Sequence, residues 1–268
     1  MRSRLPLVAS AALAACGPSP VLLPRPQRAA ESRAARLRVM TYNIESGARG
    51  LEGVGQALRE VGADLVALQE VDRGTTRAGG LDQSEALAGL AGLPYHAHFR
   101  ATGLYGGDYG LALLSRYPLR SVEQRPLPTW PGLEPRILVH AVVEVEGRLL
   151  SIYLTHLSHL PTRAPLRLQQ ARAIRAVLDA DPGPLLLLGD LNEGPDSGAV
   201  GELQRGLINV FDRVGQGPSG TYPLPVPLGP TLRLDYVLSG GGVLPRRSFV
   251  YRSPASDHYP VVADLELP

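Results

Sequence analysis

The segment PLLLLGDLN, residues 184–192, contains four consecutive leucines and then becomes polar at once. A short apolar run bounded by proline and polar residues is typical of a buried strand. Similar β-prone segments recur along the chain, and most of them also end in polar residues. They are LRVMTYNI (37–44), DLVALQEVD (64–72), GLALLSRYP (110–118), ILVHAVVEVEGRLLSIYLTH (137–156), RLDYVLS (233–239) and YPVVADLEL (259–267).

Helical segments separate these strands. Apolar residues at helical spacing predict helices over 54–62, 81–92 and 165–180. The segment 137–156 predicts a hairpin with its turn at Glu146-Gly147. Because strands and helices alternate while hairpins are interspersed, we expect mixed rather than purely parallel sheets. One domain of two sheets with helices outside fits this pattern.

Polar side chains stand at the ends of the apolar strands, where burial would penalise them. Strands that each deliver a carboxylate, carboxamide or imidazole are expected of a functional site on a rigid scaffold. The residues concerned are Asn43, Glu70, His156, Asp190, Asn192, Asp235, Asp257 and His258.

The order and spacing of seven motifs in this chain resemble those of the endonuclease/exonuclease/phosphatase superfamily. The motifs are TYNI, LQEVD, GGDYGLALLSRYP, YLTHL, LLLLGDLNEGP, LDYVL and SDHYPV. That superfamily includes deoxyribonuclease I-like nucleases, apurinic endonucleases, inositol-phosphate 5-phosphatases and bacterial sphingomyelinases. The resemblance covers residues 37–268, and GDLN together with SDH is its most specific part. It implies a four-layer α/β sandwich, in which two mixed β-sheets pack face to face with helices outside.

Hydrolysis of a phosphate ester needs a divalent cation, a deprotonated water, and an acid or metal at the leaving oxygen. Asn43, Glu70 and Asp257 offer hard oxygen ligands that suit Mg²⁺, with Mn²⁺ or Ca²⁺ as alternatives. The chain has a single cysteine and no cysteine or histidine cluster, so the sequence does not favour zinc.

Asp190 and Asn192 are two residues apart on a predicted extended segment, so both side chains can point to the same side. One can accept a proton from water while the other orients the water or binds phosphate. His156 and His258 can donate hydrogen bonds to phosphoryl oxygens or shuttle protons. The sequence alone does not separate Asp190 from His258 as the first proton acceptor; we assign Asp190 as the base and His258 as the phosphate-binding acid.

An imidazole needs a carboxylate that fixes its tautomer. The resemblance implies that Asp235 is the partner of His258, and Asp108 in GGDYG is the candidate partner of His156. Because adjacent residues on an extended chain point in opposite directions, Asp257 is expected to face the metal and His258 the phosphate.

Three further features are open to competing interpretations. Arg136 precedes a strand and could clamp a phosphate or form a surface ion pair. His96 and His98 have a metal-like H-x-H spacing, but without a third zinc-type ligand the segment is typical of a half-exposed edge strand. His159 is interpreted as a loop residue.

The N-terminus resembles the signal of a bacterial lipoprotein. Arg2 and Arg4 precede a short apolar segment that cannot span a bilayer, and LAACG places Cys16 where lipidation would occur. We therefore expect a signal peptide over 1–15, a Pro-rich tether over 16–36 and the folded domain over 37–268. The protein would be lipid-anchored outside the cytoplasm, at the outer membrane or cell surface. The alternative is an ordinary secretory signal with an incidental cysteine.

The composition bears on the substrate. Lysine is absent, and much of the arginine excess lies in the first forty residues, so charge does not favour nucleic acid as a partner. Pro-rich rims around Trp130 and over 223–230 favour lipid or small-phosphoester contacts. We predict a monomeric, Mg²⁺-dependent phosphoesterase that hydrolyses a small phosphodiester or phospholipid-type substrate, or a phosphomonoester. The alternatives are an extracellular nuclease and, in another class, a catalytically inactive surface-anchored binding protein.

Overall fold

The leucine run of segment 184–192 forms strand β8 (Leu185–Asp190), in which all six residues are buried. The strand belongs to a computed structural model that describes residues 34–224 and 231–268. Leu186 and Leu188 pack into an apolar layer between two β-sheets, whereas Leu185 and Leu187 point to the opposite face of β8 and pack against helices. The continuous apolar run therefore reflects a strand that is covered on both faces.

The strand β8 lies inside a six-stranded sheet of order β5–β6–β7–β8–β13–β9. Its other strands are β5 (Leu119–Pro126), β6 (Ile137–Val145), β7 (Arg148–His156), β9 (Ile208–Asn209) and β13 (Asp235–Gly240). β7 and β8 are parallel, and the other pairs in this sheet are antiparallel. The sheet is therefore mixed.

The second sheet has seven strands in the order β10–β14–β15–β1–β2–β4–β3. They are β1 (Ala35–Asn43), β2 (Leu65–Arg73), β3 (Tyr95–Leu104), β4 (Gly107–Ser115), β10 (Gly215–Gln216), β14 (Leu244–Val250) and β15 (Val261–Leu267). β1 and β2 are parallel, whereas β1 and β15 are antiparallel, so this sheet is also mixed. A separate two-stranded ribbon pairs β11 (Tyr222–Pro223) with β12 (Thr231–Leu232).

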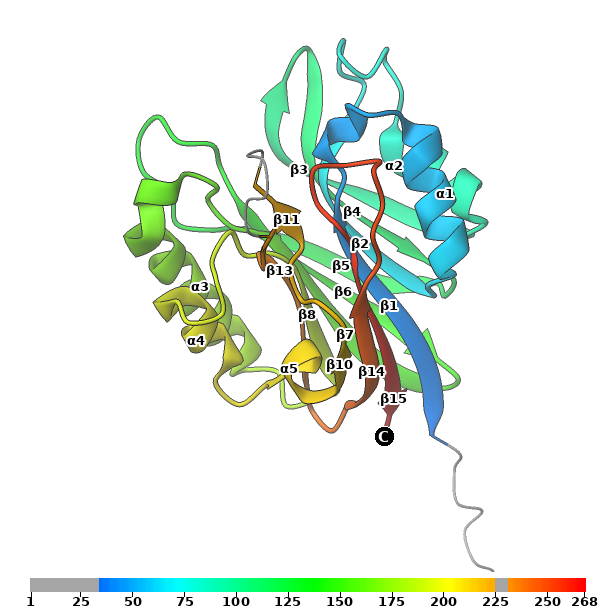
Figure 1. Ribbon diagram of the computed structural model, residues 1–268, viewed down its shortest axis with the longest axis vertical. Helices are drawn as coiled ribbons and strands as arrows, with labels where there is room; N and C mark the ends of the chain where they lie inside the picture. Colours follow the sequence, from blue (N-terminus) through cyan, green and yellow to red (C-terminus); the bar gives the residue numbers. More distant parts are fainter. Residues whose placement is uncertain (1–33, 225–230) are drawn as a thin grey trace, which may run out of the picture. The chain divides into compact units, whose positions relative to one another are not determined.

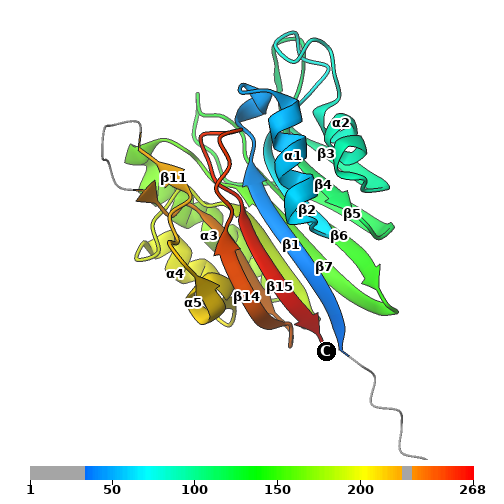
Figure 2. The same ribbon diagram turned by 45° about the vertical axis from the view of Figure 1, so that its right-hand side comes forward.

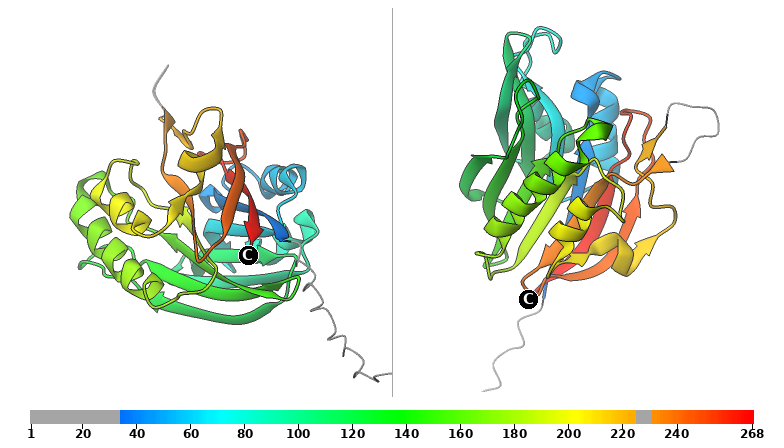
Figure 3. Two further views of the ribbon diagram at one scale, coloured as in Figure 1. Left: turned by 90° about the horizontal axis from the view of Figure 1, so that it is seen from below. Right: turned by 90° about the vertical axis from the view of Figure 1, so that its left-hand side faces the viewer.

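Helices α1 (Leu51–Val61), α2 (Gln83–Ala91), α3 (Ala164–Leu178) and α4 (Gly198–Gln204) cover the outer faces of the two sheets. The short helix α5 (Val210–Val214) instead packs into the apolar layer between the sheets, and two 3₁₀ turns complete the set, η1 (Glu45–Gly47) and η2 (Pro161–Arg163). α1 and α2 pack on the seven-stranded sheet, and α3 and α4 pack on the six-stranded sheet (Figures 1 and 2). Seen from below, the two sheets face each other between these helix pairs (Figure 3). The predicted four-layer α/β sandwich is confirmed.

The predicted elements form where the sequence places them, with small shifts at their ends, whereas β5, β14, α4 and α5 were not predicted. α1 and α2 both end at a glycine in the left-handed conformation, Gly62 and Gly92, which accepts that backbone without a Cβ clash. The predicted hairpin turn has positive φ at both Glu146 and Gly147, as a tight two-residue turn requires. β1 begins at Ala35, inside the predicted tether, because it pairs there with Leu267 of the last strand.

Several predictions fall outside the described residues. They are the signal peptide over 1–15, the lipidation at Cys16, almost all of the tether over 16–36, and the part of the Pro-rich rim over 225–230. Among the residues that the structure describes, no helix is both long enough and apolar enough to cross a membrane.

The close contact between β7 and β8 next to the end of β8 generates a stability prediction. A Cβ at Gly189 would lie 2.0 Å from the carbonyl oxygen of Thr155, so Gly189→Ala must push the two strands apart. We expect a loss of about 1–3 kcal/mol in the free energy of unfolding, measured by urea denaturation. Gly201→Ala is the matched control, because its Cβ meets nothing within 4 Å on the exposed side of α4, and it should be neutral or stabilising by up to about 1 kcal/mol. Equal stability of the two variants would contradict this account.

Candidate active site

The polar residues at the strand ends line one cleft between the edges of the two sheets, except Asp235, which is buried against His258. Parallel β1 and β2 carry Asn43 and Glu70 to this edge, and parallel β7 and β8 carry His156 and Asp190. β13 and β15 run antiparallel to β8 and β1, so they start at the same edge. The cleft has a volume of about 590 Å³. It is lined by Asn43, Glu70, His156, His159, Pro161, Arg167, Asp190, Asn192, Glu193, Gly194, Tyr222, Leu224, Leu232, Leu234, Asp257 and His258.

Strand register aligns three acidic and imidazole side chains across the six-stranded sheet. Asp190 is the register partner of His156 on one side and of Asp235 on the other. Residues that are directly paired on neighbouring strands project to the same face of a sheet. The backbone pairing alone therefore places these three side chains in one row.

Asp190 lies at the centre of the cleft and is 1% exposed. Its Oδ2 accepts a hydrogen bond from Asn43 Nδ2 at 3.1 Å, which joins the two sheets, and its Oδ1 accepts one from the backbone N–H of Asn192 at 2.9 Å. The Nε2 atoms of His156 and His258 lie 3.5 and 3.7 Å from Oδ2. Burial, and then the nearby Asp235 carboxylate, raise the pKa of Asp190 to about 7. A carboxylate in this state can accept a proton near neutral pH.

His258 is held by Asp235 beneath it. The distance from His258 Nδ1 to Asp235 Oδ2 is 2.8 Å, and both side chains are buried. Burial acts to lower the pKa of His258, but the charges of Asp235 and Asp190 outweigh it and raise this pKa to about 10. The contact expected from the resemblance is present, and it makes His258 a charged donor at neutral pH.

Glu70 reaches the cleft through a β-bulge. The register of β2 against β4 shifts between Gln69 and Val71, and Glu70 itself has a φ of 58°. A bulge inserts one unpaired residue and changes the direction of its side chain. Asn43 Nδ2 donates to Glu70 Oε1 at 3.0 Å. Burial raises the pKa of Glu70 and the charge of Asp257 adds to this, although the Asn43 hydrogen bond opposes it.

Glu70 and Asp257 fit a hard divalent cation. Both carboxylates line the same cleft, and burial raises the pKa of Glu70. Oxygen ligands of this kind suit Mg²⁺, Mn²⁺ or Ca²⁺. Asp190, Asp235 and His258 also bring ligand-type atoms within 4.8 Å of one another. Within this trio, His258 and Asp235 are already joined by a hydrogen bond of 2.8 Å.

Asn43 connects two carboxylates of the cleft. Its amide nitrogen donates to both Glu70 and Asp190, and its Oδ1 accepts the backbone N–H of Glu45 at 3.1 Å. An amide oxygen has two lone pairs, so this hydrogen bond leaves one of them for a further partner. Asn43 as a metal ligand stays a prediction, and its bridging of two carboxylates is the role that the structure shows.

Asn192 has a φ of 51°, so the segment after β8 is a left-handed turn rather than the predicted extended strand. The hydrogen bond from its N–H to Asp190 Oδ1 closes an Asx-type turn. Its amide Nδ2 donates to the carbonyl oxygen of Leu157 at 3.1 Å. Asn192 still lines the cleft beside Asp190, but the turn and not strand alternation brings it there.

The prediction that Asp108 orients His156 is wrong. Asp108 lies at the start of β4 and forms ion pairs with Arg73 at 2.5 Å and Arg100 at 2.9 Å. The Nδ1 of His156 instead faces Arg136 Nη1 at 2.9 Å. Sequence adjacency to a glycine pair could not reveal which neighbours of Asp108 carry an opposite charge.

Arg136 fits neither interpretation drawn from the sequence. It is only 4% exposed, so it forms no surface ion pair, and its side chain is directed at His156, His159 and Glu134 rather than into the cleft. His159 lines the cleft and was missed, although its spacing of three residues from His156 was a usable signal.

Tyr222 and Arg167 also line the cleft, and no sequence pattern singled them out. Arg167 was hidden within the amphipathic pattern of α3, and Tyr222 precedes the Pro-rich segment. The H-x-H pair lies on β3 at the edge of its sheet, and His98 Nε2 is 3.1 Å from the carbonyl oxygen of Val71. This agrees with the structural interpretation of that pair.

Comparisons with known proteins bear on this site. Residues 40–258 match the model of the Endonuclease/Exonuclease/phosphatase family. The Escherichia coli K12 protein YbhP is 29% identical over 254 aligned residues, which cover 86% of this chain and 96% of YbhP. A crystal structure of an endonuclease/exonuclease/phosphatase from Beutenbergia cavernae has a TM-score of 0.73 and 27% identity, covering 87% of this chain and 72% of that one.

A second solved structure is similar in fold alone. The Bacteroides thetaiotaomicron protein Bt3783 has a TM-score of 0.69 and 17% identity, covering 85% of this chain and 99% of that one.

The environment of His258 predicts how its ring titrates. In metal-free protein, NMR titration of the histidine rings should show His258 charged up to about pH 10, because Asp235 and Asp190 raise its pKa. Asp235→Asn removes the largest charge that raises this pKa while burial remains, so the pKa of His258 should fall from its wild-type value. Because the pKa of His258 is raised in the folded state, its protonation contributes to the free energy of unfolding. This contribution is complete below pH ~6.5 and is lost as the pH rises through about 10.

Asp108→Asn is the control for this titration, because Asp108 pairs with Arg73 and Arg100 on another strand. It should leave the His258 titration unchanged. A His258 ring that titrates near pH 6.5 in the wild type would refute the assignment of a charged donor.

Proposed function

Because this chain belongs to the Endonuclease/Exonuclease/phosphatase family, whose members hydrolyse phosphate ester bonds, we propose that it is a divalent-metal-dependent phosphodiesterase. The observation that carries the proposal is the buried carboxylate of Asp190. It is held by Asn43 across the two sheets and flanked by the imidazoles of His156 and His258. A buried base beside hydrogen-bond donors is the arrangement that water attack on phosphorus requires.

In the proposed reaction, Asp190 accepts a proton from the attacking water at Oδ2. A pKa of about 7 leaves this carboxylate partly ionised at neutral pH and basic enough to act. The new P–O bond forms as the bond to the alcohol breaks, and His258 donates from Nε2 toward the phosphoryl group or the leaving oxygen. Asp235 keeps that ring charged. A divalent cation held by Glu70 and Asp257 would neutralise phosphate charge and stabilise the leaving oxygen.

The walls of the cleft favour a substrate with an apolar arm. Tyr222, Leu224, Leu232 and Leu234 are part of its lining. Glu70 also borders a second groove of about 790 Å³, whose lining includes Leu51, Leu81, Leu90, Ala48, Ala78 and Ala86 besides charged residues such as Glu45, Glu52 and Arg77. Apolar side chains beside a polar centre fit a phosphodiester that carries hydrocarbon, such as a phospholipid-type substrate.

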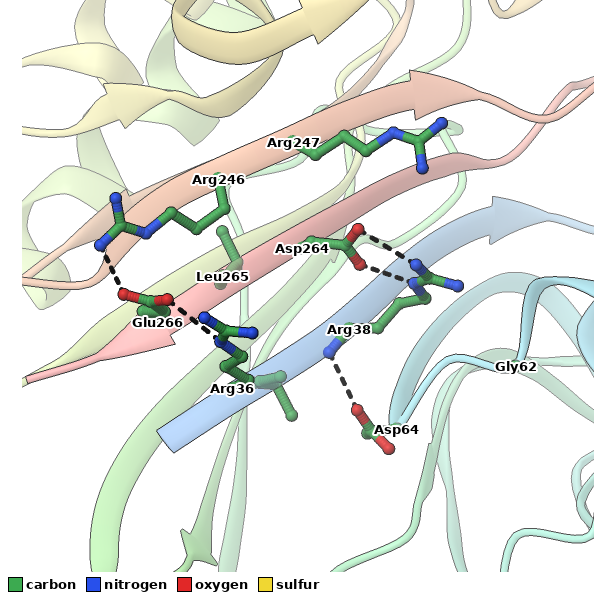
Figure 4. A pocket seen from close by; sticks show the side chains of 10 residues that line it. Arg36, Arg38, Gly62, Asp64, Arg246, Arg247, Asp264, Leu265 and Glu266 are labelled. Carbon is green, nitrogen blue, oxygen red and sulfur yellow. Dashed lines mark hydrogen bonds and ion pairs between the residues drawn. The ribbon is translucent and has the colours of Figure 1, made fainter. Parts of the chain in front are cut away.

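The arginines of the described residues do not form a polyanion site. Arg167 is the one arginine that lines the cleft, and it is buried and donates to Glu193 and to the carbonyl oxygens of Ser158 and Leu160. Arg36, Arg38, Arg246 and Arg247 surround a separate hollow (Figure 4).

That hollow is far from the cleft and its charge is largely compensated. Arg36 and Arg38 lie near the start of β1, on the order of 20 Å along the strand from Asn43. Three of the four arginines pair with acidic side chains: Arg36 and Arg246 with Glu266, and Arg38 with Asp264. Binding of nucleic acid would need unpaired cations along the cleft.

Hydrolysis of bis(p-nitrophenyl) phosphate tests the proposed activity. We expect turnover that EDTA abolishes and that Mg²⁺ or Mn²⁺ restores. Asp190→Asn and His258→Gln should each lower kcat by at least about 10²-fold, because they remove the base and the charged donor, with the fold preserved by circular dichroism. Asp108→Asn should keep near wild-type kcat. Absence of metal-dependent turnover on every phosphoester would refute the activity and favour a surface binding protein that only retains the fold.

A substrate panel tests the apolar arm. A phospholipid in mixed micelles should exceed methyl p-nitrophenyl phosphate, p-nitrophenyl phosphate, and single- and double-stranded DNA in kcat/KM. Leu232→Asp on the rim should lower kcat/KM for the phospholipid by about tenfold through lost apolar contact, and leave the methyl ester unchanged. Faster cleavage of DNA would establish the extracellular nuclease instead. Bt3783 is named as a mannosyl-6-phosphatase, and p-nitrophenyl phosphate is a phosphomonoester. Its rate of hydrolysis therefore decides whether this enzyme prefers phosphodiesters or phosphomonoesters.

We also propose, from the sequence alone, that Cys16 is lipidated and that the enzyme is located outside the cytoplasm. We further propose that it is a monomer and that its cation is Mg²⁺. A lipid anchor would bring the cleft near phospholipid headgroups, which supports the substrate class above. Fatty-acid labelling that survives Cys16→Ala would contradict the anchor.

A further inference from the structure

We propose that Arg136 fixes the ring tautomer of His156 and His159, so that both present a neutral Nε2–H as a donor to the phosphoryl oxygens of the substrate. Arg136 is thus a positioning residue, and the two histidines form what we call the donor pair. The identity of the acceptor rests on the proposed function, whereas the tautomers do not.

The geometry begins with a buried guanidinium. Arg136 immediately precedes β6 and is 4% exposed. Its Nη1 lies 2.9 Å from His156 Nδ1 and its Nη2 lies 3.0 Å from His159 Nδ1. Glu134 Oε1 lies 3.0 Å from Nη1 and balances the charge. The two terminal nitrogens of the rigid, planar Arg136 guanidinium therefore each contact one imidazole ring.

A guanidinium can only donate, because it carries five N–H groups and remains protonated in proteins. Each Nδ1 that it contacts must therefore be an acceptor, which requires a lone pair and no hydrogen. A neutral imidazole with a bare Nδ1 carries its hydrogen on Nε2. The donor chemistry of Arg136 thus dictates the same tautomer in both histidines.

The charge of Arg136 acts in the same direction. Burial, and then the positive charge of Arg136, lower the pKa of His156 well below its ordinary value, so the ring is neutral at physiological pH. His159 shows the same direction from the same two causes.

The Nε2 of His156 lacks a hydrogen-bond partner within the described part of the chain, although it is buried. Asp190 Oδ2 lies 3.5 Å from this nitrogen, which is too distant for a good hydrogen bond. An unpaired buried donor costs about 1–3 kcal/mol unless a ligand satisfies it. Since His156 lines the cleft, a phosphoryl oxygen beside Asp190 is the acceptor that this donor fits.

This arrangement divides the work between the histidines around Asp190. His258 has a carboxylate behind it and is charged, whereas His156 has an arginine behind it and is neutral. A neutral ring whose bare nitrogen is blocked by Arg136 cannot accept a proton from water. His156 therefore binds phosphate without exchanging protons, and Asp190 and His258 carry the proton transfer.

Long-range ¹H–¹⁵N spectra of the metal-free protein test the tautomers without any substrate. We expect a bare Nδ1 and a protonated Nε2 in both rings at neutral pH, assigned with His156→Asn and His159→Asn. Arg136→Met should give mixed tautomers in both rings. Arg136→Lys keeps the positive charge but lacks the planar guanidinium, so it should restore the Nε2–H tautomer in at most one of the two rings. Arg120→Met is the matched control, since Arg120 is exposed and pairs with Glu144. A protonated Nδ1 in wild-type His156 would overturn the inference.

Kinetics on bis(p-nitrophenyl) phosphate test the role of the donor pair. Arg136→Met should lower kcat by about 10²–10³-fold with little change in KM, as loss of a transition-state donor does. In a His156→Ala/His159→Ala background, the same substitution should cause no further loss, because the residues act as one unit. An equal loss in both backgrounds would show that Arg136 contacts the substrate itself, contrary to the proposal.

The two experiments separate this inference from the proposed function. If the wild type hydrolyses no phosphoester, the proposed function fails, while the ring spectra still decide the tautomers. If turnover is robust but the rings in Arg136→Met match those of the wild type, the inference about Arg136 fails alone.

Discussion

The hydrogen bond from Asn43 to Asp190 is the interaction on which the site depends, because it joins the two sheets at the floor of the cleft. A buried carboxylate is costly, and here it is stabilised by donors from both sheets and from the turn that follows it. The same Asn43 amide also contacts Glu70, so one side chain sets the distance between the proposed base and the proposed metal ligands. The four-layer packing keeps these strand ends rigid relative to each other.

Around Asp190, two imidazoles have opposite electrostatic surroundings although each lies less than 4 Å from the same oxygen. The partner behind each ring decides its state: a carboxylate behind His258 and a guanidinium behind His156. A fold that supplies residues from different strands can separate a charged donor from a neutral one over a short distance. The apolar walls of the cleft then decide which phosphoesters reach this centre.

Much of the fold could be predicted because apolar periodicity reports burial directly. The leucines of β8 and the alternation in the 137–156 hairpin are examples, whereas β5, which is exposed along most of its length, left no comparable signal. The strand-end residues could be grouped because parallel neighbours end at the same edge. Their detailed roles could not be read, since Glu70 reaches the cleft by a bulge and Asn192 by a left-handed turn, and neither follows strand alternation.

The sequence by itself determined the layer order, the family and most of the polar side chains at the strand ends, because these follow from hydrophobic pattern and motif order along the chain. Only the tertiary structure decided the pairings: Asp108 with Arg73 and Arg100, His156 with Arg136, and the amide of Asn43 with two carboxylates. The physical reason is that hydrogen bonds and ion pairs depend on distances of a few ångströms between residues far apart in sequence. Such distances are set by sheet register, bulges and turns, which local composition does not encode.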